Sequence, residues 1–175
     1  MSTPTVTSAF PGGRSGDAAT LVFEYMAATQ AETGRTVPAG TGELPAVLRL
    51  ECSSLQDVYR PPGIFLIADL GSRPAGCVGL AALPGGRTAE VRRLYIRPAH
   101  RGHGIARTLM NHAHDHAARH SMTRLILDVL PARTSVISFY RRLGYTETEP
   151  FETESPVPMI YMERAIIRSD ILNGS

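Results

Sequence analysis

The sequence is poor in cysteine, in net charge and in long apolar runs, and each shortage excludes a class of protein. Its two cysteines, Cys52 and Cys77, lie far apart and form no CxxC motif, so we expect free thiols, with Cys77 buried, in a reducing, cytoplasmic setting. A net charge of +2 argues against nucleic acid as a partner. No apolar run approaches the ~18 residues that span a bilayer, which argues against a membrane partner. Residues 1–16 lack the pattern of a secretion signal.

The chain has the length and composition of one globular domain, residues 1–175, of which 1–5 are expected to be mobile. Helical spacing is found at residues 18–32, 44–55, 105–121 and 135–143, and Asp17 is a candidate N-cap. Strand patterns are found at residues 6–10, 64–70, 75–83, 89–97, 124–130, 145–148 and 159–165. Short turns predict antiparallel pairing up to residue 97, whereas strand 124–130 follows a strand–helix unit and should lie parallel to strand 89–97.

A glycine-rich turn, Arg101-Gly102-His103-Gly104-Ile105-Ala106, joins strand 89–97 to the following helix. Glycines allow a ligand close to the backbone, and the first turn of a helix offers unpaired N–H groups, a combination that binds phosphates. The spacing excludes a Walker A loop. A dinucleotide fingerprint would need glycine at Arg107 and could use Asp128 for a ribose, but a βαβ unit in mid-chain argues against it. A tight turn without a ligand is the plain structural alternative.

Two motifs in order extend this interpretation. The turn matches Arg/Gln-x-x-Gly-x-Gly/Ala, strand 90–98 is its usual lead-in, and Ser138-Phe139-Tyr140-Arg141-Arg142-Leu143-Gly144-Tyr145 is its usual later helix and turn. Together they resemble the GNAT superfamily of acyl-CoA-dependent N-acyltransferases, most closely over residues 77–165. The resemblance implies a single-domain α/β fold with a mixed β-sheet, an antiparallel first half and a central βαβ unit, flanked by helices. It also leaves a homodimer open.

The same resemblance implies how acetyl-CoA would bind. The pyrophosphate would rest on the amides of residues 102–106, with Arg101 and Arg107 adding positive charge. The pantetheine would pair with the strand edge at 94–96, where two parallel strands separate, and an N–H there could stabilise an oxyanion. The residues expected to bind the cofactor are therefore Leu94, Tyr95, Ile96, Arg101, Gly102, His103, Gly104, Ile105, Ala106 and Arg107.

The implied reaction moves an acetyl group from acetyl-CoA directly to an amine, with a small molecule favoured over a protein as acceptor. Tyr140 stands where the family has a general acid near the sulfur, and its alternative role is packing its helix on the sheet. Glu90 stands where the family often takes the amine proton through water, with a solvated carboxylate as the alternative. The function classes left open are a non-catalytic acyl-CoA sensor, a nucleotide-dependent oxidoreductase and transfer to a hydroxyl.

Other features are less specific. Arg133 replaces an asparagine that contacts the pantetheine in many relatives, so its role in cofactor binding is open. Histidines 112, 116 and 120 recur at helical spacing, but no outside ligand completes a metal site, so we expect a polar helix face and no metal. The acidic run 147–154 would suit a cationic acceptor if it lined the cleft, with a solvated loop as the alternative, and Tyr161 could point into that cleft.

Overall fold

A computed structural model describes residues 3–151 and 157–167. One sheet of seven strands has the order β1-β2-β3-β4-β5-β7-β6. The strands are β1 Thr5–Ser8, β2 Ile64–Leu70, β3 Arg73–Ala82, β4 Thr88–Ile96, β5 Arg124–Val129, β6 Thr146–Glu147 and β7 Ile160–Ala165. The helices are α1 Ser15–Glu32, α2 Ala46–Ser53, α3 Leu55–Val58, α4 Ile105–Arg119 and α5 Thr134–Arg142, with the short 3₁₀ helices η1 Thr41–Glu43 and η2 Pro98–His100.

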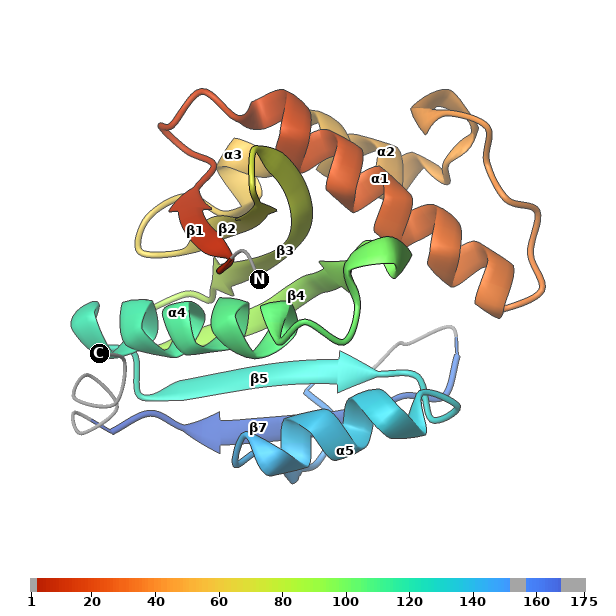
Figure 1. The fold of residues 1–175 in the computed structure, drawn as a ribbon. Helices are drawn as coiled ribbons and strands as arrows, with labels where there is room; N and C mark the ends of the chain where they lie inside the picture. The colour runs from red at the N-terminus through yellow and green to blue at the C-terminus, as the bar shows by residue number, and fades with distance from the viewer. Residues whose placement is uncertain (1–2, 152–156, 168–175) are drawn as a thin grey trace.

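The topology confirms the predicted α/β class. Strands β1 to β4 pair antiparallel, and β4 pairs parallel with β5, so that α4 is the crossover of a central βαβ unit. Figure 1 shows the arrows of β4 and β5 pointing the same way and that of β7, next to β5, pointing the opposite way. A strand–helix–strand connection of this length places the second strand parallel to the first, so the sequence pattern was sufficient to predict the parallel pairing of β4 and β5.

The two faces of the sheet bury separate cores. On β2, Leu66 and Ala68 point to one face and Phe65 and Ile67 to the other, following the period of two. The first face packs against α4 and α5, and the second against α1 and α3. Figure 1 shows α1, α2 and α3 gathered at one end of the molecule, with α4 running along the sheet below them. Helix α2 also packs against this core through Leu48 and Cys52, and α1 and α2 together form a roof on the second face.

Some predicted boundaries are wrong. Helix α1 begins at Ser15 with Arg14 at its N-cap, so Asp17 lies in the first turn instead of capping it. Its carboxylate is favourable there because it faces the positive end of the helix dipole and accepts a 3.0 Å bond from Arg14 Nε. Residue Thr5, predicted to be mobile, pairs with Asp69 in the sheet, and residues 1–2 lie outside the described residues. The second predicted helix divides at Ser54, so that Leu55 begins α3.

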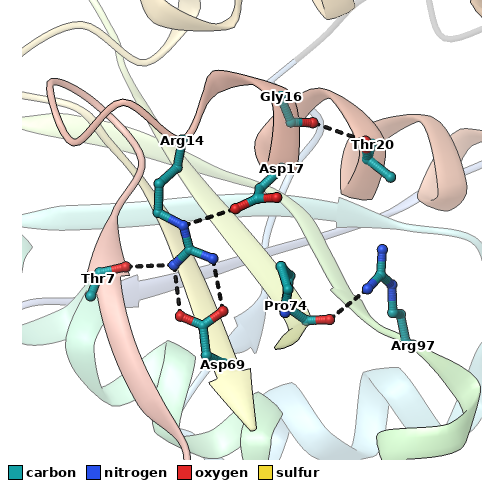
Figure 2. A network of polar contacts seen from close by, with 8 residues as sticks. All are labelled: Thr7, Arg14, Gly16, Asp17, Thr20, Asp69, Pro74 and Arg97. Carbon is teal, nitrogen blue, oxygen red and sulfur yellow. Dashed lines mark hydrogen bonds and ion pairs between the residues drawn. The ribbon is translucent and has the colours of Figure 1, made fainter. Parts of the chain in front are cut away.

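The start of α1 is fastened to the sheet by Arg14. Its two Nη atoms each donate a 2.7 Å hydrogen bond to the carboxylate of Asp69 on β2, and Nη1 also donates to Thr7 on β1. Figure 2 shows this planar fork between Asp17 and Asp69, with Arg97, the residue after β4, reaching the carbonyl of Pro74 on β3. A bidentate pair of this kind fixes orientation as well as distance, so the first turn of the roof has a defined position over the sheet.

The sheet splits after Glu90. Parallel pairing between β4 and β5 runs only from Thr88 opposite Arg124 to Glu90 opposite Ile126, although β4 continues to Ile96. Just beyond, the β3–β4 register shifts by one residue, and Arg93 has a left-handed backbone with φ of 57°. A bulge of this kind bends its strand. The bend carries the second half of β4 away from β5 and opens a cleft between them.

Candidate active site

The cleft at the split has a volume of about 1170 Å³. Its floor and sides come from the second half of β4, the end of β5 and helix α5, and its roof comes from α1 and α2. Residues Val157 and Pro158 close one side. Segments far apart in sequence therefore meet at one hollow.

The glycine turn opens onto the same hollow. An adjoining pocket of about 300 Å³ is lined by the turn, the start of α4 and Phe139 of α5, and it shares Ile96, Arg101 and Ala106 with the main cleft. The backbones of Gly102 and Gly104 are left-handed, with φ of 81° and 74°, and nothing lies within 4 Å of where a Cβ would stand at either position. The space in front of the turn is therefore open to a ligand.

Backbone N–H groups are concentrated at this turn. Gly104 is the N-cap of α4 and no side chain caps the helix. The amides of residues 102–107 donate no hydrogen bond to a described acceptor, because the first bond back to the turn is made by Thr108. Unpaired amides at the start of a 15-residue helix form a positive, anion-binding end. The turn fits a pyrophosphate by this geometry.

Nearly all predicted cofactor residues line one of the two pockets. Leu94, Tyr95 and Ile96 lie on the stretch of β4 that no described strand pairs with on its β5 side. Ile105 contributes its backbone, since its side chain is buried in the core. His103 is the exception, because it lines neither pocket and its Nδ1 lies 2.9 Å from the carbonyl oxygen of Arg101. The two remaining charges, Arg101 and Arg107, stand at the open turn.

Glu90 and Tyr140 both line the main cleft, one from β4 and one from α5. The Glu90 side chain is 9% exposed and its Oε2 lies 2.5 Å from Nη2 of Arg92. Tyr140 is buried against Tyr145, and burial raises the pKa of its phenol. Its hydroxyl makes no hydrogen bond to a described residue. A tyrosine that stays protonated and unengaged beside the cleft can donate a proton there.

The roof contributes residues that sequence reasoning missed. Tyr25 of α1 lies under two guanidinium groups, with Arg93 Cζ at 5.3 Å and Arg133 Cζ at 5.6 Å from its ring centroid. Arg93 also grips Glu51 of α2 through two hydrogen bonds of 2.9 and 2.6 Å. Adjacent arginines in an otherwise apolar strand were the available signal, but which helix they meet is decided by tertiary packing.

Arg133 faces the roof. Its Nε donates 2.7 Å to Glu32 and its Nη2 donates 2.9 Å to Thr29, both on α1, and its Nη1 lies 3.4 Å from the hydroxyl of Tyr25. Three nitrogens of the guanidinium are thus engaged by α1, across the cleft from β4. In this position Arg133 ties the start of α5 to the end of α1.

The remaining candidates lie elsewhere. His116 Nε2 lies 2.8 Å from the carbonyl of Pro62 and its ring stacks on that of His120, and the described residues hold no cluster of three or more metal-binding side chains. Glu147 pairs with Arg141 outside the cleft lining, whereas residues 152–154 of the acidic run lie outside the described residues. Tyr161 is buried against Phe151 and does not line the cleft, so the expectation that it points into the cleft is wrong.

Cys77 is free and buried, as predicted. Within the described ranges, no helix combines the length and apolarity needed to cross a bilayer.

Comparison with known proteins agrees with this geometry. The IAA acetyltransferase of Azospirillum brasilense is 29% identical over 113 residues, covering 64% of this chain and 74% of that protein. Among solved structures, a GNAT-family acetyltransferase from Staphylococcus aureus Mu50 has a TM-score of 0.72 at 13% identity, with 94% and 100% of the two chains covered. The spermidine N-acetyltransferase of Vibrio cholerae, solved with CoA and spermine, has a TM-score of 0.67 at 19% identity, with 97% and 98% covered. A family model described as Acetyltransferase (GNAT) family matches residues 31–145, and the chain belongs to that family.

Proposed function

We propose that this protein transfers an acetyl group from acetyl-CoA directly to the amine of a small molecule. Acetyl-CoA is the donor used by the family. The observation that carries the proposal is the row of unpaired amides at residues 102–107, which opens onto a cleft beside an unpaired stretch of β4. Such amides suit the two linked phosphates of coenzyme A, and the free strand edge suits the amide groups of its pantetheine arm.

Several contacts must act together to hold the donor. One contact with a helix dipole contributes only about 0.3–1 kcal/mol, whereas micromolar binding requires about 8 kcal/mol. The amides of the turn, the charges of Arg101 and Arg107, and hydrogen bonds along residues 94–96 together supply contacts of the required number and kind. All of them lie along one continuous path, because the two pockets share Ile96, Arg101 and Ala106.

The protein's own residues would then transfer protons and position the two reactants. When bound, the donor supplies a thioester whose carbonyl carbon forms a bond to the amine nitrogen while its bond to sulfur breaks. Glu90 would accept the proton that the amine loses, directly or through water, and Tyr140 would protonate the departing sulfur. An N–H of the 94–96 segment would stabilise the carbonyl oxygen as negative charge develops there. Holding the two reactants in line can itself lower the barrier by about 7–11 kcal/mol.

The enclosed roof supports a small acceptor. Arg133 joins α5 to α1, and Arg93 joins β4 to α2, so the acceptor side of the cleft is bridged at two points. These two bridges favour a small molecule over a folded protein surface as the acceptor. Transfer to a protein would need an extended segment that threads between them.

Two measurements test the proposal. Thermal unfolding with acetyl-CoA or with NAD(P) comes first, and we expect stabilisation by acetyl-CoA alone. Release of free thiol from acetyl-CoA in the presence of a broad amine panel comes second. Stabilisation without thiol release would identify a sensor that binds the donor without using it, and stabilisation by NAD(P) alone would refute the proposal.

A further inference from the structure

On the acceptor side of the cleft, meaning the part beneath the roof helices α1 and α2, arginines and glutamates form ion pairs with one another. The sequence contains no lysine, and no histidine lines the cleft, so each described cation of the cleft carries a planar guanidinium. Among the described residues, four carboxylates line the cleft; three of them are paired with such groups, and the fourth, Asp128, is also engaged. The pairs are Glu32 with Arg133 at 2.7 Å, Glu51 with Arg93 at 2.6 Å and Glu90 with Arg92 at 2.5 Å.

Hydrogen-bond donors are therefore in surplus there. A guanidinium has five N–H groups, and within the described ranges Arg92 uses only Nη2, on Glu90. Its Nε is buried and bonds to no described residue. The side chain as a whole is 32% exposed at the cleft. The partly exposed guanidinium therefore has N–H groups left to donate to an oxygen-rich group that enters the cleft beside Arg92.

Glu90 and Arg92 lie two residues apart on β4, which places both side chains on the roof face of the strand. Their polar ends touch, so one small molecule can contact both. Burial alone would lower the pKa of Arg92, but the hydrogen bond and charge of Glu90, together with nearby Tyr59 and Glu51, outweigh burial, and the pKa is raised. Arg92 therefore carries its positive charge at neutral pH.

We infer that the acceptor is an amine that also carries a carboxylate, as an amino acid does, and that Arg92 binds this carboxylate while the amine lies at Glu90. The inference deepens the proposed function and rests on it. A polycation would find every described carboxylate of the cleft already engaged and would face three guanidiniums. An amino acid offers a carboxylate to Arg92 and an amine to Glu90. Both groups are attached to the same carbon atom, which suits two side chains whose polar ends touch.

The test uses matched acceptor pairs. Each of a set of amino acids is compared with its own α-amide and with a polyamine, and kcat/KM is measured by thiol release at saturating acetyl-CoA. We expect the wild type to prefer the acid over its amide by about 10–150-fold, the range for one charge-assisted hydrogen bond. In Arg92→Met the ratio of kcat/KM for the acid to that for its amide should fall towards one. Arg92→Lys keeps the positive charge but loses the planar set of N–H donors, so it should retain part of the preference.

A matched control separates this role from general damage. Arg124 on β5 also pairs with a glutamate, Glu163, but lies outside the cleft lining, so Arg124→Met should keep the wild-type preference. Equal use of acid and amide by the wild type, faster turnover of the polyamine, or an unchanged preference in Arg92→Met would overturn the inference while leaving the proposed function intact. Thiol release with no amine at all would instead count against the proposed function. If Arg92→Met does not fold, the comparison of Arg92→Lys with wild type decides.

Discussion

Replacing Gly104 by alanine separates two properties of the glycine turn, which are its left-handed backbone conformation and its capacity to bind phosphate. Gly104 has φ of 74° and open space where the Cβ would stand, so the alanine meets no protein atom within 4 Å. The left-handed backbone should cost about 1–2 kcal/mol. Each kcal/mol lowers Tm by roughly 2–4 °C in a chain of this size. The methyl group would project into the space in front of the amides, and losing one charge-assisted hydrogen bond of about 1.5–3 kcal/mol weakens binding roughly 10–150-fold.

The assay is calorimetric titration with acetyl-CoA, read alongside thermal unfolding without ligand. Gly13→Ala is the matched control, because Gly13 has φ of 72°, equally open surroundings and a place in the turn before α1 outside both pockets. Both variants should lose similar stability, but only Gly104→Ala should lose affinity. If acetyl-CoA bound Gly104→Ala as tightly as wild type, the turn would not be the phosphate site.

Three further outcomes are expected. Tyr140→Phe should lower kcat about 100-fold or more, in the range of general acid catalysis, while the Kd for acetyl-CoA stays unchanged; an unchanged kcat would leave Tyr140 a packing residue. Arg133→Met should raise the acceptor KM and leave the Kd for acetyl-CoA unchanged, since its guanidinium contacts α1; a weaker Kd would instead indicate a cofactor role. Burial raises the pKa of Tyr59, Tyr140 and Tyr145, so the unfolded state loses these protons first and the free energy of unfolding should fall as pH rises above about 10, measured by urea denaturation; a flat profile from pH 9 to 11 would contradict this.

Much of the fold was predictable because local patterns agree with the tertiary structure. Strand β2 was predicted with its exact bounds at 64–70, and the parallel placement of β5 followed from its strand–helix connection. The donor side of the site lies on one continuous stretch, β4 to α4, so its residues are neighbours in sequence and their motif was recognisable. Boundaries failed where a local signal was ambiguous, as at Asp17, whose carboxylate suits both the N-cap and the first turn.

The acceptor side was not predictable in the same way. Tyr25, Glu51 and Arg133 come from three separate elements and meet only when the roof packs over the split sheet. Helical spacing identified α1, but periodicity does not say which of its polar residues face a cleft. The prediction for the acidic run relied on sequence position near the last strand, and Glu147 instead pairs with Arg141 away from the cleft.

Arg93 combines a strained backbone conformation with a side-chain contact that holds the roof. Its backbone adopts a left-handed conformation that glycine would accept more readily, yet its guanidinium holds Glu51 of α2 with two hydrogen bonds. A glycine here would relax the main chain but remove the bonds to Glu51, whereas a lysine would keep the positive charge and the torsional cost but lose the paired hydrogen bonds. The bend of β4 and the position of α2 above it therefore both depend on the same residue.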